Sequence, residues 1–139
     1  MTFTLFGRWQ TRIFLISTVG VLVTVPFAAI ASYSSLTFLL ILFYLTLLGL
    51  IWDGLYNFLQ QFKWDRDWPG IFQLFAGIWE ALFLITLIKS IGLPLIPKTL
   101  AIPIFVVHYT CVWLAIYLSS QILMKLLFPH WRFHGGRLF

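Results

Sequence analysis

The sequence predicts an all-α integral membrane protein, a bundle of four transmembrane helices. Hydrophobic residues make up 61% of its 139 residues and charged residues only 9%, whereas a soluble domain is typically about one quarter charged. A helix needs about 20 apolar residues to cross the hydrocarbon core, because its backbone amides must be satisfied within the segment. Segments of this kind occur at 13–31, 36–52, 71–88 and 100–124. They do not alternate in polarity, which excludes a transmembrane barrel, and they make one domain, 1–139.

The first two spans are joined by Ser32-Tyr33-Ser34-Ser35, a connection so short that they must form an antiparallel hairpin. The first span also resembles a cleavable secretory signal, since two arginines precede its apolar run and Ala29-Ile30-Ala31 ends it. Its apolar character continues past Pro26, and it is long enough to cross a bilayer. We therefore expect it to remain as a helix, with cleavage as the alternative.

The connection between the second and third spans predicts a short interfacial amphipathic helix that continues the second span. Its apolar residues recur at i, i+3, i+4 and i+7 and would line one face: Leu55, Phe58, Leu59 and Phe62. Pro69 fits the first position of the third helix. The connection at 89–98 contains Pro94 and Pro97, which favour a short, stiff turn before the fourth span.

The distribution of lysine and arginine predicts that both termini are cytoplasmic. Seven basic residues fall on the side of the termini: Arg8, Arg12, Lys63, Arg66, Lys125, Arg132 and Arg137. The other side carries only Lys89 and Lys98. The net charge of +5 is therefore read as a topology signal and an attraction to anionic lipid headgroups, and nucleic acid is not an expected partner.

The aromatic and acidic residues between the second and third spans form a candidate cytoplasmic docking surface. They are Asp53, Trp64, Asp65, Arg66, Asp67 and Trp68. Its three aspartates also allow a divalent-cation site, which would suit phospholipid chemistry at the headgroups. A charge-compensated turn whose acids cap the next helix is favoured, because a cation needs more oxygen ligands than this spacing guarantees.

Glu80 is the most anomalous residue, because an ionised side chain that faces lipid costs at least ~2.5 kcal/mol. It should therefore face protein or water, and be neutral unless a cation supports its charge. Gln73, Gly77 and Glu80 share one helix face, which is typical of a close interhelical contact with polar groups bonding across it. His108 in the fourth span is the expected partner of Glu80. The pair is read either as a proton relay or as a buried hydrogen bond that fixes packing, and the second is favoured.

The C-terminal segment is expected to lie on the headgroups as an aromatic and basic anchor. Its expected headgroup contacts are Lys125, His130, Trp131, Arg132 and Arg137. His130 and His134 have the i, i+4 spacing that could share a metal, but a proline precedes them and no acid is near. We therefore expect no metal site there.

No standard catalytic or phosphate-binding motif is present, and the single cysteine, Cys111, excludes an internal disulfide. The leading hypothesis is a non-catalytic subunit, scaffold or assembly partner that needs no cofactor. It would bind a membrane protein, or a second copy of itself, through the docking surface and the polar, small-residue helix faces. The alternative is a small channel or proton-linked transporter using Glu80 and His108. A membrane-bound lipid enzyme using Asp53, Asp65 and Asp67 is the third possibility.

Overall fold

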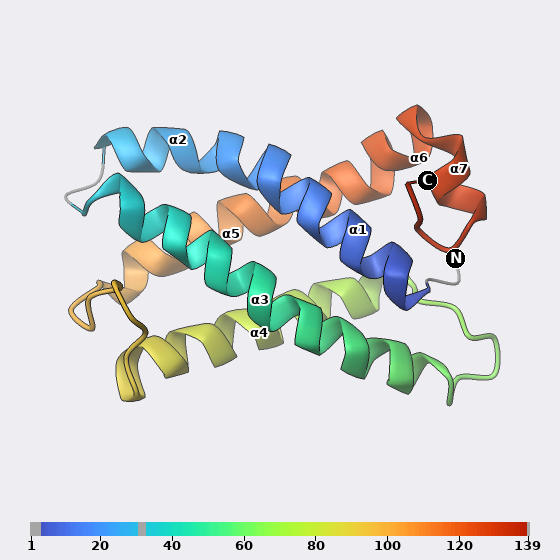
Figure 1. The fold of residues 1–139 in the computed structure, drawn as a ribbon, viewed down its shortest axis with the longest axis horizontal. Coiled ribbons are helices and arrows are strands. Elements are labelled where there is room, and N and C mark those ends of the chain that lie inside the picture. The colour runs from blue at the N-terminus through green and yellow to red at the C-terminus, as the bar shows by residue number, and fades with distance from the viewer. Residues whose placement is uncertain (1–3, 31–32, 139) are drawn as a thin grey trace.

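In the computed structural model, which describes residues 4–30 and 33–138, all regular secondary structure is helical. Four helical rods lie along the long axis (Figure 1) and are long and apolar enough to cross a membrane, as expected: Leu5–Ile30, Ser35–Gln60, Gly70–Ser90 and Ile102–Leu127. The first comprises α1 (Leu5–Leu15), the π-helical turn η1 (Ile16–Gly20) and α2 (Val21–Ile30). The second and third are α3 (Ser35–Gln60) and α4 (Gly70–Ser90). The fourth comprises α5 (Ile102–Leu118), η2 (Ser119–Leu123) and α6 (Met124–Leu127), and α7 (Pro129–Phe133) follows it.

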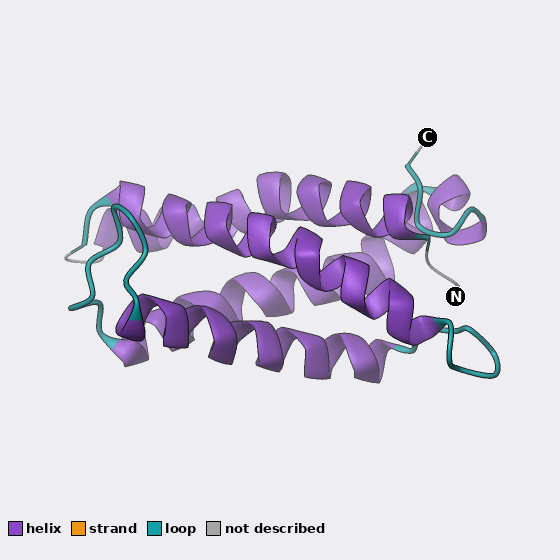
Figure 2. Cartoon of the chain, turned by 60° about the horizontal axis from the view of Figure 1, so that its bottom comes forward, coloured by secondary structure: helices purple, strands orange, loops and turns teal. Residues whose placement is uncertain are grey.

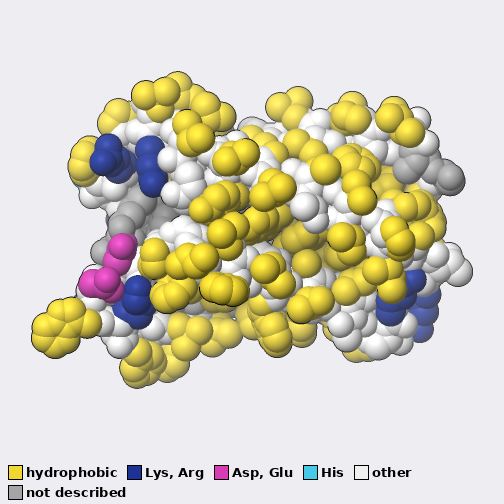
Figure 3. All heavy atoms as spheres, turned by 180° about the vertical axis from the view of Figure 1, so that it is seen from behind, with side chains coloured by type: hydrophobic (Ala, Val, Ile, Leu, Met, Phe, Trp, Pro, Cys, Tyr) yellow, Lys and Arg dark blue, Asp and Glu magenta, His cyan; other side chains and the backbone are white. Residues whose placement is uncertain are grey.

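Both chain ends lie at one end of the bundle, which we call the terminal end (Figure 1). The loops gather at the two ends, so the rods alternate in direction (Figure 2). The surface is divided along the same axis. Hydrophobic side chains cover the middle of the face in Figure 3, and Lys and Arg gather at its two ends. This pattern is consistent with a membrane protein.

The helix expected to continue the second span is part of α3, which runs without a break to Gln60. The predicted apolar face of that segment points outward, with Leu55, Phe58 and Leu59 exposed. Its opposite face, which carries Asp53, Tyr56 and Gln60, is buried. The end of α3 thus buries its polar face and exposes its apolar face, which is the reverse of an amphipathic helix in a soluble protein.

The helices extend beyond two of the predicted spans. The first rod begins at Leu5 rather than at residue 13, and its start is capped by Thr4, whose hydroxyl accepts from the backbone N–H of Gly7 at 3.1 Å. The second rod ends at Gln60 rather than at residue 52. The extra turns carry polar residues that are buried inside the bundle. The predicted end of the first span, Ala31, and its neighbour Ser32 lie outside the described residues.

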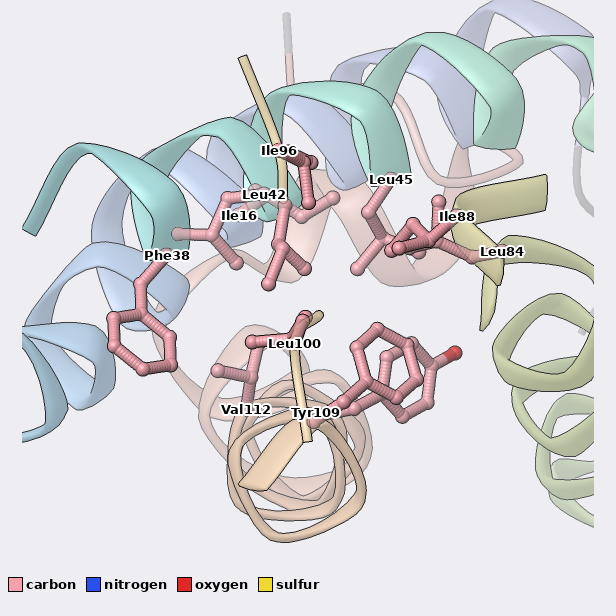
Figure 4. Close-up of a cluster of buried hydrophobic side chains, with 12 residues drawn as sticks. Ile16, Phe38, Leu42, Leu45, Leu84, Ile88, Ile96, Leu100, Tyr109 and Val112 are labelled. Atoms are coloured by element: carbon pink, nitrogen blue, oxygen red, sulfur yellow. The ribbon is translucent and has the colours of Figure 1, made fainter. Parts of the chain in front are cut away.

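The hydrophobic core fills the half of the bundle away from the terminal end. Side chains from η1, α3, α4, α5 and the loop before α5 converge there (Figure 4), and they include Ile16, Phe38, Leu45, Leu84, Ile88, Leu100, Tyr109 and Val112. A second, smaller cluster at the terminal end joins Leu15, Met124 and Trp131.

The C-terminal segment is bonded to the start of α1. The backbone N–H of Thr4 donates to the carbonyl of Gly135 at 2.9 Å, and the N–H of Leu138 donates to Oε1 of Gln10 at 3.0 Å. The two ends of the described chain are therefore held together by hydrogen bonds.

Trp131 is not the headgroup contact that we predicted. Its side chain is 1% exposed, and its indole N–H donates to Oγ1 of Thr11 at 2.7 Å. The ring packs against Leu15 and Met124, so its apolar body is buried while its N–H keeps a hydrogen-bond partner. The other predicted headgroup residues are exposed: Lys125, His130, Arg132 and Arg137.

Candidate functional site

Arg12 binds two carboxylates from two other rods. Its Nε and Nη2 donate to the two oxygens of Asp53 at 2.8 and 2.9 Å. Its Nη1 and Nη2 donate to the two oxygens of Glu80 at 2.9 and 3.0 Å. The planar guanidinium suits this paired geometry, which a lysine could not reproduce. The arginine thus joins α1, α3 and α4 at one point.

The surroundings of Arg12 are built for this arrangement. Asp53 and Glu80 are 4% and 6% exposed, and the hydroxyl of Tyr56 donates to Oε1 of Glu80 at 3.1 Å. Gly49 lies directly under the guanidinium, since a Cβ there would fall 2.8 Å from Cδ of Arg12 and still closer to its Nη1. Gly49 therefore makes the space in which Arg12 reaches both acids.

Arg8 continues this polar layer toward the terminal end. Its Nη2 donates to Oε1 of Gln60 at 2.6 Å, and its guanidinium lies 4.6 Å from the centroid of the Trp68 ring. That distance is typical of a cation–π contact. Gln60 in turn donates to the backbone carbonyl of Arg66 at 2.6 Å, which ties the following loop to α3.

A cavity of about 120 Å³ lies beside this network. That volume is close to the roughly 150 Å³ of an engineered cavity that holds benzene. Its charged walls are Arg8, Arg12, Asp53 and Glu80, and its aromatic walls include Trp68, Trp113 and Trp131. Ile16, Leu45 and Tyr109 line it too and belong to the hydrophobic core, so the core closes the cavity on the side away from the terminal end.

The chain matches no protein-family model, no curated protein and no solved structure. Its function must therefore be argued from the cavity and from the residues around it.

The expected pair of Glu80 and His108 is not formed. Nε2 of His108 lies 3.0 Å from Oγ1 of Thr24, and that hydroxyl already donates to the carbonyl of Gly20. His108 must therefore be the donor, which assigns its proton to Nε2. Its ring is fully buried between Phe27 and Phe38, at centroid distances of 5.1 and 4.9 Å. The cation that supports Glu80 is Arg12.

The third expected polar residue, Gln73, bridges α4 and η2. Its Nε2 donates to Oγ of Ser120 at 3.2 Å, and its Oε1 accepts from Nε2 of Gln121 at 3.1 Å. Gly77, one turn further along α4, accepts from the hydroxyl of Tyr109 at 2.7 Å. The face shared by Gln73, Gly77 and Glu80 is thus a polar contact with three other parts of the bundle.

The expected cytoplasmic docking residues divide into two groups. Asp53 is buried on Arg12, and Trp68 is half-buried beneath Arg8, so neither belongs to an open surface. Trp64, Asp65 and Arg66 are exposed, and Asp67 is half-buried. Asp53 lies on the inward face of α3, and the contact with Arg8 holds Trp68 at the other end of the loop against the bundle.

The loop that carries the exposed group is ordered by its own side chains. The backbone N–H of Asp67 donates to Oδ1 of Asp65 at 3.1 Å, and Nζ of Lys63 lies 3.5 Å from the same atom. The hydrogen bond and then the nearby ammonium hold the pKa of Asp65 below its ordinary value. Trp64 projects from this loop fully exposed.

The possible metal ligands do not come together. Asp53 is inside the bundle, whereas Asp65 and Asp67 are in the loop. The rings of His130 and His134 stack at 3.8 Å, and Nδ1 of His134 lies 3.0 Å from the carbonyl of His130. Within residues 4–30 and 33–138, no three His, Cys, Asp or Glu side chains form a metal-binding group.

The sequence interpretation missed Arg12, Arg8, Tyr56 and Gly49. A signal for the central contact was present, since Arg12 and Asp53 lie at nearly equal distances along the chain from the turn at 32–34. Residues so placed in an antiparallel hairpin lie at the same depth. Opposite charges at one depth indicate an ion pair rather than the ends of two spans.

Proposed function

We propose that this protein is a non-catalytic membrane protein that binds a small molecule in the cavity beside Arg12. The observation that carries the proposal is the cavity itself, which combines mostly apolar walls with a few converging polar groups. Such a combination is typical of ligand sites between the helices of a bundle. The polar groups are held in place by bonds to one another, so the site is preformed.

Binding is favoured over catalysis because the acidic groups are already engaged. Asp53 and Glu80 each accept two hydrogen bonds from Arg12, and Glu80 accepts a third from Tyr56. A carboxylate in such a cluster is a poor general base, since it would have to give up its contacts to accept a proton. This supports a role in holding a ligand rather than in converting one.

The transporter alternative has less support. It depended on Glu80 and His108 acting together, but His108 bonds Thr24 instead. The cavity also ends on Ile16, Leu45 and Tyr109 of the core. A proton path would have to cross that packed region.

Native mass spectrometry of the protein extracted in a mild detergent tests the proposal. We expect a discrete bound mass on the wild-type chain. Ile116→Trp should remove it, because Ile116 lines the cavity and a larger ring would fill it. Ile122→Trp is the matched control, since Ile122 is exposed and outside the cavity. No bound mass on the wild type, or equal retention by the Ile116 variant, would reject cavity binding.

A second candidate function, assembly with a partner or with another copy, is favoured by Trp64. A fully exposed tryptophan on an ordered loop has the character of a binding hot spot. The same spectra report oligomeric state and co-purifying subunits. If the loop mediates assembly, Trp64→Ala should shift the spectrum to the free monomer, and an unchanged assembly would reject it.

A further inference from the structure

A second hollow adjoins the cavity from outside the bundle. This apolar groove, about 250 Å³ in volume, is lined by the end of α3 and the start of α4. Leu59, Phe72, Phe75 and Trp79 form its outer walls, and all are exposed on the surface of the rods. In a bilayer, a groove of this kind faces acyl chains rather than water.

The groove and the cavity share one wall. Tyr56, Trp68 and Ala76 line both of them. Ala76 has the smallest side chain of the three. The two hollows are therefore neighbours, with the apolar groove on the outside of α3 and α4 and the cavity with Arg12 inside the bundle.

The hydrogen-bond inventory of the cavity indicates what its polar end can receive. The oxygens of Asp53 and Glu80 are engaged by Arg12. Arg12 donates four bonds, and a guanidinium carries one N–H more than that. The indole N–H of Trp113, another wall residue, bonds no residue in the part of the chain that the structure describes. These two N–H groups favour a ligand that brings acceptors.

The charge of the cavity favours a neutral ligand. Arg8 and Arg12 balance Asp53 and Glu80, and Arg12 contacts both acids directly. An added anion would lie beside two carboxylates, and an added cation beside two guanidinium groups. Either would be a buried charge without a counter-ion, which is strongly disfavoured.

We propose that the ligand is a neutral lipid with a carbonyl-bearing ring as its head, which enters sideways from the bilayer between α3 and α4. The head lies in the cavity, where its carbonyl oxygens accept from Arg12 and Trp113 and its ring lies among the tryptophans. The apolar tail remains in the groove formed by Leu59, Phe72, Phe75 and Trp79. This inference rests on the proposed function, because it requires that the cavity bind a ligand at all.

Two quinones test the head and the path separately. Decylubiquinone carries the ring and an apolar tail, and 2,3-dimethoxy-5-methyl-1,4-benzoquinone is the ring alone. Both quench tryptophan fluorescence, and the cavity is lined by Trp68, Trp113 and Trp131. In nanodiscs we expect saturable quenching of the full-length protein by both compounds. Trp113→Phe should lower the affinity obtained from the quenching curve. Trp64→Phe, which changes an exposed ring outside both hollows, should leave that affinity unchanged.

Ala76→Phe tests the sideways path. A phenyl group at the shared wall should lower the affinity for decylubiquinone by at least about tenfold, that is, raise its Kd by a factor of about ten or more. The ring alone should lose less affinity than decylubiquinone does, because it needs no groove, although Ala76 also lines the cavity. Ile78→Phe is the matched control, since Ile78 is exposed on the same helix and lines neither hollow. Equal affinity of the Ala76 and Ile78 variants for decylubiquinone would overturn the path.

The outcomes also separate this inference from the proposed function. Decanoate, an anion of similar tail length, should not compete with decylubiquinone, and competition would overturn the neutral class. A bound mass in the native spectrum without saturable quinone quenching would keep cavity binding and reject the carbonyl-ring lipid. Absence of both would reject the two proposals together.

Discussion

Arg12 and Glu80 are 68 residues apart in the chain, yet Nη1 of one lies 2.9 Å from Oε2 of the other inside the bundle. Asp53 shares the same guanidinium, so three rods depend on one side chain. Charged groups at such depth are stabilising only when they are paired and hydrogen-bonded. The loss of any one of these groups should therefore lower the stability of the bundle by an amount that depends on whether the remaining buried charges still have a partner.

Arg12→Met should lower the free energy of unfolding by about 3–5 kcal/mol, because it leaves two carboxylates buried without their cation. Glu80→Gln should cost less, since Asp53 keeps its bond to Arg12. Unfolding in mixed detergent micelles, followed by circular dichroism, measures both. Equal stability of the Arg12 variant and the wild type would show that the ion pair does not support the bundle.

Gly49→Ala should destabilise the bundle by about 1–3 kcal/mol, since overpacking displaces the guanidinium from its two acids. Gly54→Ala is the matched control on α3, because no atom lies within 4 Å of its added Cβ. Both changes raise helix propensity equally, so their difference isolates the contact with Arg12. The same unfolding assay compares them, and a difference near zero would contradict this role of Gly49.

Both termini should face the cytoplasm, since seven of the basic residues lie at the terminal end and two at the other. A reporter fused to the C-terminus and active only outside the cell should be silent, and one active only in the cytoplasm should give signal. The reversed result would refute the orientation.

The first rod should be retained in the mature protein. Cleavage after Ala31 would remove Arg12 and leave Asp53 and Glu80 without a cation. Intact-mass measurement on protein purified from membranes should include residues 1–31. A mass lacking them would support the secretory-signal alternative.

The loop contact of Asp65 should respond to acid. The pKa of Asp65 is lowered in the folded loop. The contact therefore stabilises the fold at pH values above the unfolded pKa of about 3.9, and this stabilisation is lost as the pH falls through the folded pKa. Carbon-13 NMR of the Asp65 carboxyl should give a midpoint below that of an unfolded peptide. Lys63→Met should raise the midpoint, and an unshifted midpoint would contradict the contact.

The sequence was a good guide to the rods and a poor guide to their inner faces. Apolar length alone predicts four membrane-length helices, because no soluble fold has so little polar surface. The same rule failed at Arg12 and Asp53, where charges were taken as the ends of spans. A charge that finds its counter-charge at the same depth can remain inside, and a single-segment rule takes no account of the partner.

His108 shows a different limit. His108 is fully buried, but it does not contact Glu80. Its partner, Thr24, depends on how η1 and α2 lie against α5, and a threonine in an apolar span gives no signal in the sequence that it will bond a histidine. Helix pairing beyond the first hairpin is not encoded in the local pattern.

The shared guanidinium also bears on how the chain is made. Helices are synthesised from the N-terminus, so Arg12 would reach a bilayer before either acid exists. An unpaired arginine is disfavoured in a bilayer, so the first helix would be better stabilised there once Asp53 has followed it. The first two helices should therefore enter as a hairpin, with the arginine already neutralised by one acid and open to the second. Glu80 on the third helix would then bind the guanidinium that the first two helices already hold in place. The order of synthesis would therefore also be the order of assembly.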